Sequence, residues 1–266
     1  MTRYTVNGSI LLTDLPLLER PGAVQAAGFS AVEFWWPFSE AEPTDAEVDR
    51  FVAAVSDAGV TLTGLNFFAG DMPAGDRGLV SWKSRQAEFL ANLPVVTAIG
   101  ERLGCRAFNA LYGLRNDECS PDEAGALALD NLTEAATAVA RIGGTVLLEP
   151  VSGAEGYPLR TAADALAVID ALRERGVDNV KLLADFYHLT VNGDDVDAVI
   201  REHAAEFGHI QIADAPGRGE PGSGTAPLSR WIADAEAGGY DGWVGLEYKT
   251  SAADPFAWLP REQRSA

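Results

Sequence analysis

The chain has 266 residues, of which 47% are hydrophobic, and its 39 acidic residues outnumber 20 basic ones to give a formal net charge of −19. Such a charge disfavours tight binding of nucleic acid, which depends on Lys and Arg neutralising phosphates. The length and the apolar content suit one domain with a substantial core.

Eight short apolar runs alternate with longer helical patterns along the chain. The predicted strands cover residues 5–11, 31–36, 61–67, 105–112, 145–150, 180–187, 209–214 and 243–248. The clearest helical patterns cover residues 47–59, 86–104, 127–144 and 161–176. Each of these patterns ends in glycine, which favours the left-handed conformation at a helix end.

Eight strand and helix alternations over this length predict a closed (β/α)8 TIM barrel, an α/β fold that forms a single domain over residues 1–266. An open, doubly wound sheet is the structural alternative. That fold more often carries a glycine-rich phosphate loop directly after its first strand, and the segment NGSILL is not such a loop.

The sequence also bears on location. Asp14 and Pro16 interrupt the apolar residues near the start, so we predict no secretory signal. No run of about 20 apolar residues occurs, so we expect neither a membrane-spanning helix nor a membrane partner. Cys105 and Cys119 form no spaced metal motif and are too few for a disulfide scaffold. A reducing, cytoplasmic location is the resulting prediction.

Oxygen-bearing side chains stand near the carboxyl ends of four successive predicted strands: Glu149, Asp185, Gln211 and Glu247. In a barrel these ends share the face on which active sites are built. Three close carboxylates repel one another unless some are protonated or a cation lies among them. We therefore predict a divalent metal, and hard oxygen ligands favour Mg²⁺ or Mn²⁺ over Zn²⁺. Alternatively, a separate hydrogen bond or salt bridge satisfies each acid.

The segment GHIQIADAPGRGEPGSG, residues 208–224, begins like a buried strand but carries Gln211 and Asp214. Buried amides and carboxylates need partners, and a bound ligand is one possible source. For Glu33 and Asn109, also near strand ends, backbone hydrogen bonds are the simplest role, and His209 is expected to be structural. Trp35 either walls a pocket or belongs to core or interface packing, so a homo-oligomer is plausible.

The chain resembles the hydroxypyruvate isomerases, a family within the xylose-isomerase-like barrels. The matching stretches, spread over nearly the entire chain, are GFSAVEFWWPF, FFAGDMPAGDRG, LLEPV, DFYHL, GHIQIADAPGRGEPGSG and GWVGLEYK. The resemblance implies that Glu149, Asp185, Gln211 and Glu247 hold a divalent metal. It also implies that the two glutamates are catalytic and move a proton.

Three more positions match substrate contacts of the wider superfamily: Glu155, His188 and Arg218. His188 would hydrogen-bond a substrate oxygen, although it could instead cap a local carbonyl. Arg218 would bind a substrate carboxylate through two hydrogen bonds, although it could instead be an exposed loop cation.

The chain departs from the family pattern at several positions. Ser152 stands where many relatives carry Asn, and Leu65 precedes Asn66 where some have His. Thr225 and Ala226 follow the glycine loop where an acidic residue is frequent. These changes leave the predicted metal ligands intact and leave the substrate open.

The resemblance predicts a metal-dependent isomerase that interconverts hydroxypyruvate and tartronate semialdehyde by proton transfer through an enediolate. A 2-oxo-tetronate isomerase, a ketose epimerase or a polyol dehydratase remain alternatives, because each begins with proton abstraction beside a carbonyl. A barrel endonuclease would need several His ligands and a basic face, whereas this chain has three His and a charge of −19. A non-catalytic sugar- or metal-binding module is the third class. The expected partner is thus a small keto acid or sugar.

Overall fold

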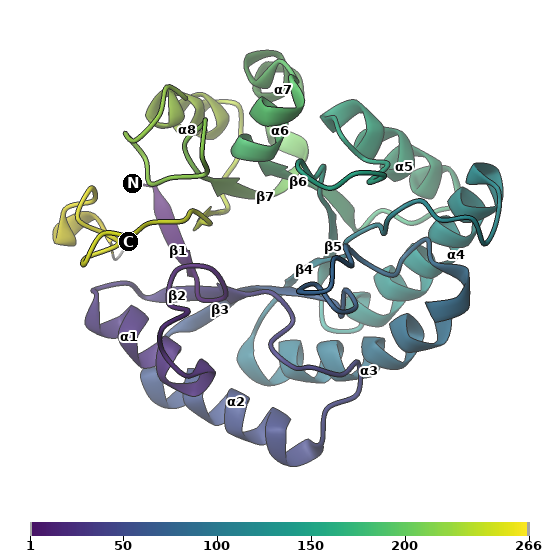
Figure 1. Cartoon of the computed structure of the whole chain (residues 1–266), viewed down its shortest axis with the longest axis horizontal. Helices are drawn as coiled ribbons and strands as arrows, with labels where there is room; N and C mark the ends of the chain where they lie inside the picture. The colour runs from purple at the N-terminus through teal and green to yellow at the C-terminus, as the bar shows by residue number, and fades with distance from the viewer. Residues whose placement is uncertain (1, 265–266) are drawn as a thin grey trace.

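A computed structural model describes residues 2–264 and confirms the predicted barrel. Eight parallel strands follow one another around a closed sheet, and β8 pairs with β1 to complete it (Figure 1). The strands are β1 (Arg3–Asn7), β2 (Ala31–Phe34), β3 (Thr61–Asn66), β4 (Ala107–Asn109), β5 (Thr145–Leu148), β6 (Val180–Asp185), β7 (Phe207–Ile212) and β8 (Trp243–Leu246).

Helices surround this sheet, as expected for a TIM barrel (Figure 1). The α-helices are α1 (Arg20–Ala26), α2 (Asp45–Ala58), α3 (Gln86–Leu103), α4 (Pro121–Ala140), α5 (Ala162–Glu174), α6 (Phe186–Asn192), α7 (Val196–His203) and α8 (Leu228–Ala237). None of those helices combines the length and the apolar character that crossing a bilayer requires, within residues 2–264.

The predicted elements differ from the observed ones mainly at their ends. All eight predicted strands run too far at the carboxyl end, and β6 shows one reason: it ends at Asp185 and α6 begins at Phe186, with no loop between them. Hydrophobic content alone does not separate a buried strand from the first turn of a buried helix. Helix α4 begins six residues before the predicted pattern, because Ser120 and Glu123 form a capping box at its start.

The loops that follow the carboxyl ends of the strands enclose an open cavity of about 1350 Å³. Its lining includes Glu149, His188, Arg218 and Glu247, together with aromatic side chains that follow β2 and β3. The fold therefore brings these four predicted site residues to one opening of the barrel.

Candidate active site

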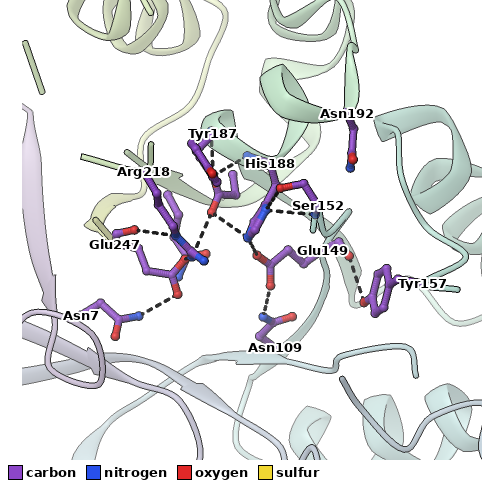
Figure 2. A network of polar contacts seen from close by, with 12 residues as sticks. Asn7, Asn109, Glu149, Ser152, Tyr157, Tyr187, His188, Asn192, Arg218 and Glu247 are labelled. Atoms are coloured by element: carbon purple, nitrogen blue, oxygen red, sulfur yellow. Dashed lines mark hydrogen bonds and ion pairs between the residues drawn. The ribbon is translucent and has the colours of Figure 1, made fainter. Parts of the chain in front are cut away.

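Three carboxylates and one imidazole meet at the base of this cavity. Glu149 directly follows β5, Asp185 ends β6, His188 lies in the first turn of α6, and Glu247 directly follows β8. One potential ligand atom of each lies within 4.8 Å of those of the others, and all four side chains are buried. Figure 2 shows Glu149, His188 and Glu247 of this cluster. This buried cluster could bind a metal ion.

Asp185 has two roles at the junction of β6 and α6. Its Oδ1 accepts hydrogen bonds from the backbone N–H groups of Tyr187 (2.8 Å) and His188 (3.1 Å), so it caps the helix. Its Oδ2 is buried and has no hydrogen-bond partner among residues 2–264. The capping bonds thus fix the carboxylate so that its second oxygen faces the cluster.

Gln211 lies on β7 beside Asp185, its partner in the strand register. The Nε2 atom of Gln211 donates to Glu33 Oε1 at 2.7 Å, whereas its Oε1 is buried and finds no hydrogen-bond partner in the described part of the chain. Buried oxygens without partners are rare in native proteins. Asp185 and Gln211, neighbours in the strand register, thus each carry a buried oxygen without a partner among the described residues, and oxygens of this kind suit a hard divalent cation.

The two glutamates have different partners. Glu247 Oε1 accepts hydrogen bonds from Trp35 Nε1 (2.6 Å) and Asn7 Nδ2 (3.2 Å), and Glu247 Oε2 forms an ion pair with Arg218. Glu149 Oε2 accepts one bond, from Asn109 Nδ2 at 2.7 Å (Figure 2). Protein donors therefore stabilise the ionised form of Glu247 more strongly than that of Glu149.

Burial dominates the protonation of these groups. It raises the pKa of Glu149 well above the ordinary value, and the negative charges of Glu247 and Asp185 add to the shift. Burial likewise raises the pKa of Asp185, and it raises the pKa of Glu247 to about 7 although Arg218 opposes the shift. These acids therefore favour a proton or a cation at the site.

The hydrogen bonds of His188 determine its tautomer. Its Nδ1 accepts from the backbone N–H of Ser152 at 3.0 Å, and a backbone N–H can only donate. Burial, helped by Arg218, lowers the pKa of His188 to about 3, so the ring is neutral at physiological pH. The remaining nitrogen, Nε2, then carries the hydrogen and lies 3.7 Å from both Glu149 Oε1 and Asp185 Oδ2. His188 is thus a hydrogen-bond donor facing the site, which suits a substrate oxygen better than a metal.

The predicted substrate contacts separate into two groups. Arg218 lines the cavity, pairs with Glu247 and lies over the ring of Tyr187, with a positive φ of 58°. Glu155 is exposed in the loop after β5 and does not line the cavity. Its role as a substrate contact stays a prediction.

Asp214 is correctly expected to need partners, but these are protein groups and not a ligand. Its carboxylate accepts from the backbone N–H groups of Ala215, Gly222 and Ala226 at 2.8 to 3.0 Å. These bonds hold the glycine-rich loop that carries Arg218.

Several functional side chains were not identified from the sequence. Asn109 and Glu33 were expected to bond backbone groups, but their side chains bond other side chains instead. Asn109 bonds Glu149, and Glu33 bonds Gln211. Trp35 contributes a hydrogen bond to Glu247 as well as an aromatic wall, and Asn7 joins two strands of the site. For Asn7 and Asn109, their position at the carboxyl end of a strand was the available indication.

A scan of protein families matches residues 21–265 to the xylose isomerase-like TIM barrels. The chain belongs to this family. The match spans every described strand except β1.

Individual relatives agree with this assignment. A Streptomyces coelicolor protein named as a candidate hydroxypyruvate isomerase is 49% identical over 272 residues, which cover 99% of this chain and 98% of the relative. The 2-oxo-tetronate isomerase of Cupriavidus necator is 33% identical over 97% of this chain and 98% of its own. A crystal structure from Brucella melitensis, titled AP endonuclease, family 2, superimposes with a TM-score of 0.87 at 28% identity and covers 97% of this chain and 98% of the other.

Proposed function

We propose that this chain is a metal-dependent isomerase that interconverts hydroxypyruvate and tartronate semialdehyde. The observation that carries the proposal is the placement of two buried glutamates, Glu149 and Glu247, around one cluster at the base of the cavity. The high identity to a relative named as a candidate hydroxypyruvate isomerase supports the same reaction.

Glu149, Asp185, Gln211 and Glu247 would hold the metal, with Mg²⁺ or Mn²⁺ as the proposed ion because all four offer oxygen. When bound, a divalent cation acts as a Lewis acid toward oxygens of the substrate and as a template that orients them. His188 stays outside the ligand set because its Nε2 carries hydrogen.

The chain's own acids would move the proton. Isomerisation of hydroxypyruvate removes a proton from C3 and delivers one to C2, while O2 gains a proton and O3 loses one, so that atoms balance through an enediol or enediolate. Glu149 and Glu247 are the proposed proton-transfer pair. Burial raises the pKa of both acids, that of Glu247 to about 7, and a carboxyl group with a raised pKa can both accept and return a proton.

Arg218 and His188 would orient the substrate. Arg218 is the cation nearest the cluster, and its planar fork suits a carboxylate. The Nε2–H of His188 would donate to a substrate hydroxyl or carbonyl oxygen. Glu155 remains a proposed contact although it does not line the cavity.

A four-carbon 2-oxo acid is the alternative substrate. The cavity of about 1350 Å³ leaves ample room beyond a three-carbon molecule, and one relative is named a 2-oxo-tetronate isomerase. The same proton transfer would serve both substrates, so the two differ only in what fills the outer cavity.

Endonuclease action is a poorer explanation, although one solved structure carries that title. The chain has three His, and its charge of −19 repels a polyphosphate backbone. Of these histidines, only His188 lines the cavity.

Solvent deuterium exchange tests the proposed reaction. Purified protein with Mn²⁺ or Mg²⁺ should introduce deuterium into hydroxypyruvate and convert it to tartronate semialdehyde, and chelation should stop both. A parallel assay with 2-oxo-tetronate identifies the preferred chain length. Normal metal binding without exchange into either acid would instead favour a non-catalytic binding module.

Two variants test the assignment of the glutamates. Glu149→Gln and Glu247→Gln keep side-chain size but remove the acid, and each should lower turnover by about 100-fold or more. Glu101→Gln in α3 is the matched comparison, because Glu101 is exposed and does not line the cavity. Retained turnover in both buried variants would exclude them as the proton-transfer pair.

A further inference from the structure

Glu33 is a buried carboxylate with no place in the reaction proposed above. It lies on β2 with 2% of its surface exposed. Its Oε1 accepts from Gln211 Nε2 (2.7 Å) and Asn7 Nδ2 (3.0 Å), and its Oε2 lies 2.6 Å from His209 Nε2. An isolated anion in such a position is costly, so these three partners are what make it tolerable.

The contacts of Glu33 determine which way the amide of Gln211 points. Glu33 Oε1 accepts hydrogen bonds from two amide N–H groups, whereas an amide has a donating end and an accepting end. If the amide were reversed, Gln211 Oε1 would face Glu33 Oε1 at hydrogen-bond distance and repel it. The observed orientation therefore leaves Oε1 facing away from Glu33, buried and without a partner among the described residues.

His209 and the strand geometry hold Glu33 in place. His209 and Gln211 lie two residues apart on β7, so their side chains project to the same side of the strand. Both reach Glu33 from β7, across the barrel interior from β2. A Cβ at Gly245 of β8 would lie 2.8 Å from Glu33 Oε1 and 2.9 Å from Gln211 Cγ, so glycine leaves the space that this contact occupies.

We propose that Glu33 is a positioning residue, which fixes the amide of Gln211 so that Oε1 is presented to the metal. This inference rests on the proposed metal site. Asn7 extends the effect, because its Nδ2 also bonds Glu247 Oε1 and its Oδ1 accepts from the backbone N–H of Ser9. One buried carboxylate thereby bonds two amides, and one of these also bonds Glu247.

Mn²⁺ binding to the full-length protein, measured by the electron paramagnetic resonance signal of the free ion, tests this role. Glu33→Gln should weaken Mn²⁺ binding by about 10- to 100-fold, because Gln211 can then adopt either amide orientation. Thr63→Val is the matched control: it removes the buried hydrogen bonds of the Thr63 hydroxyl to Thr5 and to the backbone oxygen of Val32, which involve neither the Glu33 side chain nor Gln211. Its Mn²⁺ affinity should equal that of the wild type.

The double variant Glu33→Gln with Gln211→Glu separates an effect on the orientation of the Gln211 amide from an effect on the stability of the fold. It exchanges the acid and the amide, so the hydrogen bond and the net charge remain while a carboxylate, which needs no orientation, faces the metal. We expect this variant to bind Mn²⁺ more tightly than Glu33→Gln alone. If the role of Glu33 were purely structural, Gln211→Glu would change the Mn²⁺ affinity by the same factor in the wild-type and Glu33→Gln backgrounds. The double variant also serves as the test if the single variant does not fold.

The outcomes distinguish this inference from the metal proposal. If the wild type binds no Mn²⁺, or binds it as tightly as Asp185→Asn, the metal site itself is wrong. If the wild type binds Mn²⁺ and Glu33→Gln binds it equally well, only the role of Glu33 is overturned. If the exchanged pair fails to restore binding, orientation of the amide is not the cause of the loss.

Discussion

Glu149 and Glu247 are chemically identical, yet their surroundings separate their properties. Glu247 receives two side-chain N–H groups and an arginine, whereas Glu149 receives a single amide. Hydrogen bonds to a charged acceptor are stronger than neutral ones and favour its ionised form. We therefore expect Glu247 to lose its proton more readily than Glu149.

The pKa of Glu247 gives a pH-dependent stability for the metal-free protein. Its pKa is raised to about 7 by burial, so between pH 4.5 and 7 the native state holds a proton that the unfolded chain has released. The stabilisation is complete below pH 4.5 and is lost as pH rises through 7, at up to about 1.4 kcal/mol per pH unit. His188 acts oppositely between about pH 3 and 6.5, because its pKa is lowered.

Comparison with Glu247→Gln removes the contribution of His188, which both proteins share. In urea unfolding with chelator, the wild type should lose stability relative to Glu247→Gln as pH rises from 5 to 8. Parallel pH profiles for the two proteins would show that Glu247 titrates normally.

Trp35 should tune Glu247 through its indole N–H. Trp35→Phe removes the 2.6 Å bond to Glu247 Oε1, so the pKa of Glu247 should rise further. Since a bond to a charged group contributes about 1.5–3 kcal/mol, kcat/KM at neutral pH should fall about ten-fold or more. The rising limb of the kcat/KM profile should also move to higher pH.

Trp36→Phe provides the control for Trp35. Trp36 lines the same cavity, but its indole N–H donates to the backbone oxygen of Glu40. If both substitutions changed kcat/KM equally, the hydrogen bond of Trp35 would have no effect on Glu247 and Trp35 would only line the cavity.

At the scale of elements, the apolar runs predicted the order and type of all eight strands, because a strand buried on both faces needs a continuous hydrophobic sequence. They did not predict strand ends, where Asp185 stops β6 by capping α6. The convergence of Glu149, Asp185 and Glu247 followed from the topology alone. The contacts of Glu33 with His209 and Gln211 could not be predicted in this way. A contact across the barrel interior depends on strand register and tilt, which hydrophobicity does not encode.

Two glycines show how element packing shapes the site. Gly245 on β8 has no room for a Cβ beside Glu33 and Gln211, so Gly245→Ala should destabilise the fold by about 1–3 kcal/mol. Gly125 lies inside α4, where an added Cβ would meet no atom within 4 Å, so Gly125→Ala should stabilise the fold by about 0.5–1 kcal/mol. Urea unfolding of both variants measures the difference. Equal effects would mean that the space around Gly245 relaxes freely.

At the scale of the whole molecule, the site forms only when β1 pairs with β8 and closes the barrel sheet. Asn7 and Glu247 are 240 positions apart, yet they share a hydrogen bond because β1 and β8 pair directly. The site thus joins both ends of the barrel sheet, and what stabilises the site also stabilises closure. A ligand that binds only this assembled arrangement stabilises the entire fold by mass action.

Metal binding should therefore appear as global stability. At a free Mn²⁺ concentration of 100 times Kd, the native state gains about 2.7 kcal/mol. At about 2 °C per kcal/mol for a chain of this size, Tm should rise by roughly 5 °C, and chelation should reverse it. The gain should be larger at pH 8 than at pH 6, because the ligands must lose their protons before they bind a cation.

Asp185→Asn decides whether the ion binds at the barrel mouth. Asparagine still caps α6 through its side-chain oxygen, so the fold should survive while one anionic ligand is lost. With 39 acidic residues in the chain, Mn²⁺ could also bind weakly on the surface. Surface binding would raise the Tm of Asp185→Asn as much as that of the wild type, whereas binding at the buried cluster requires the rise to disappear in the variant.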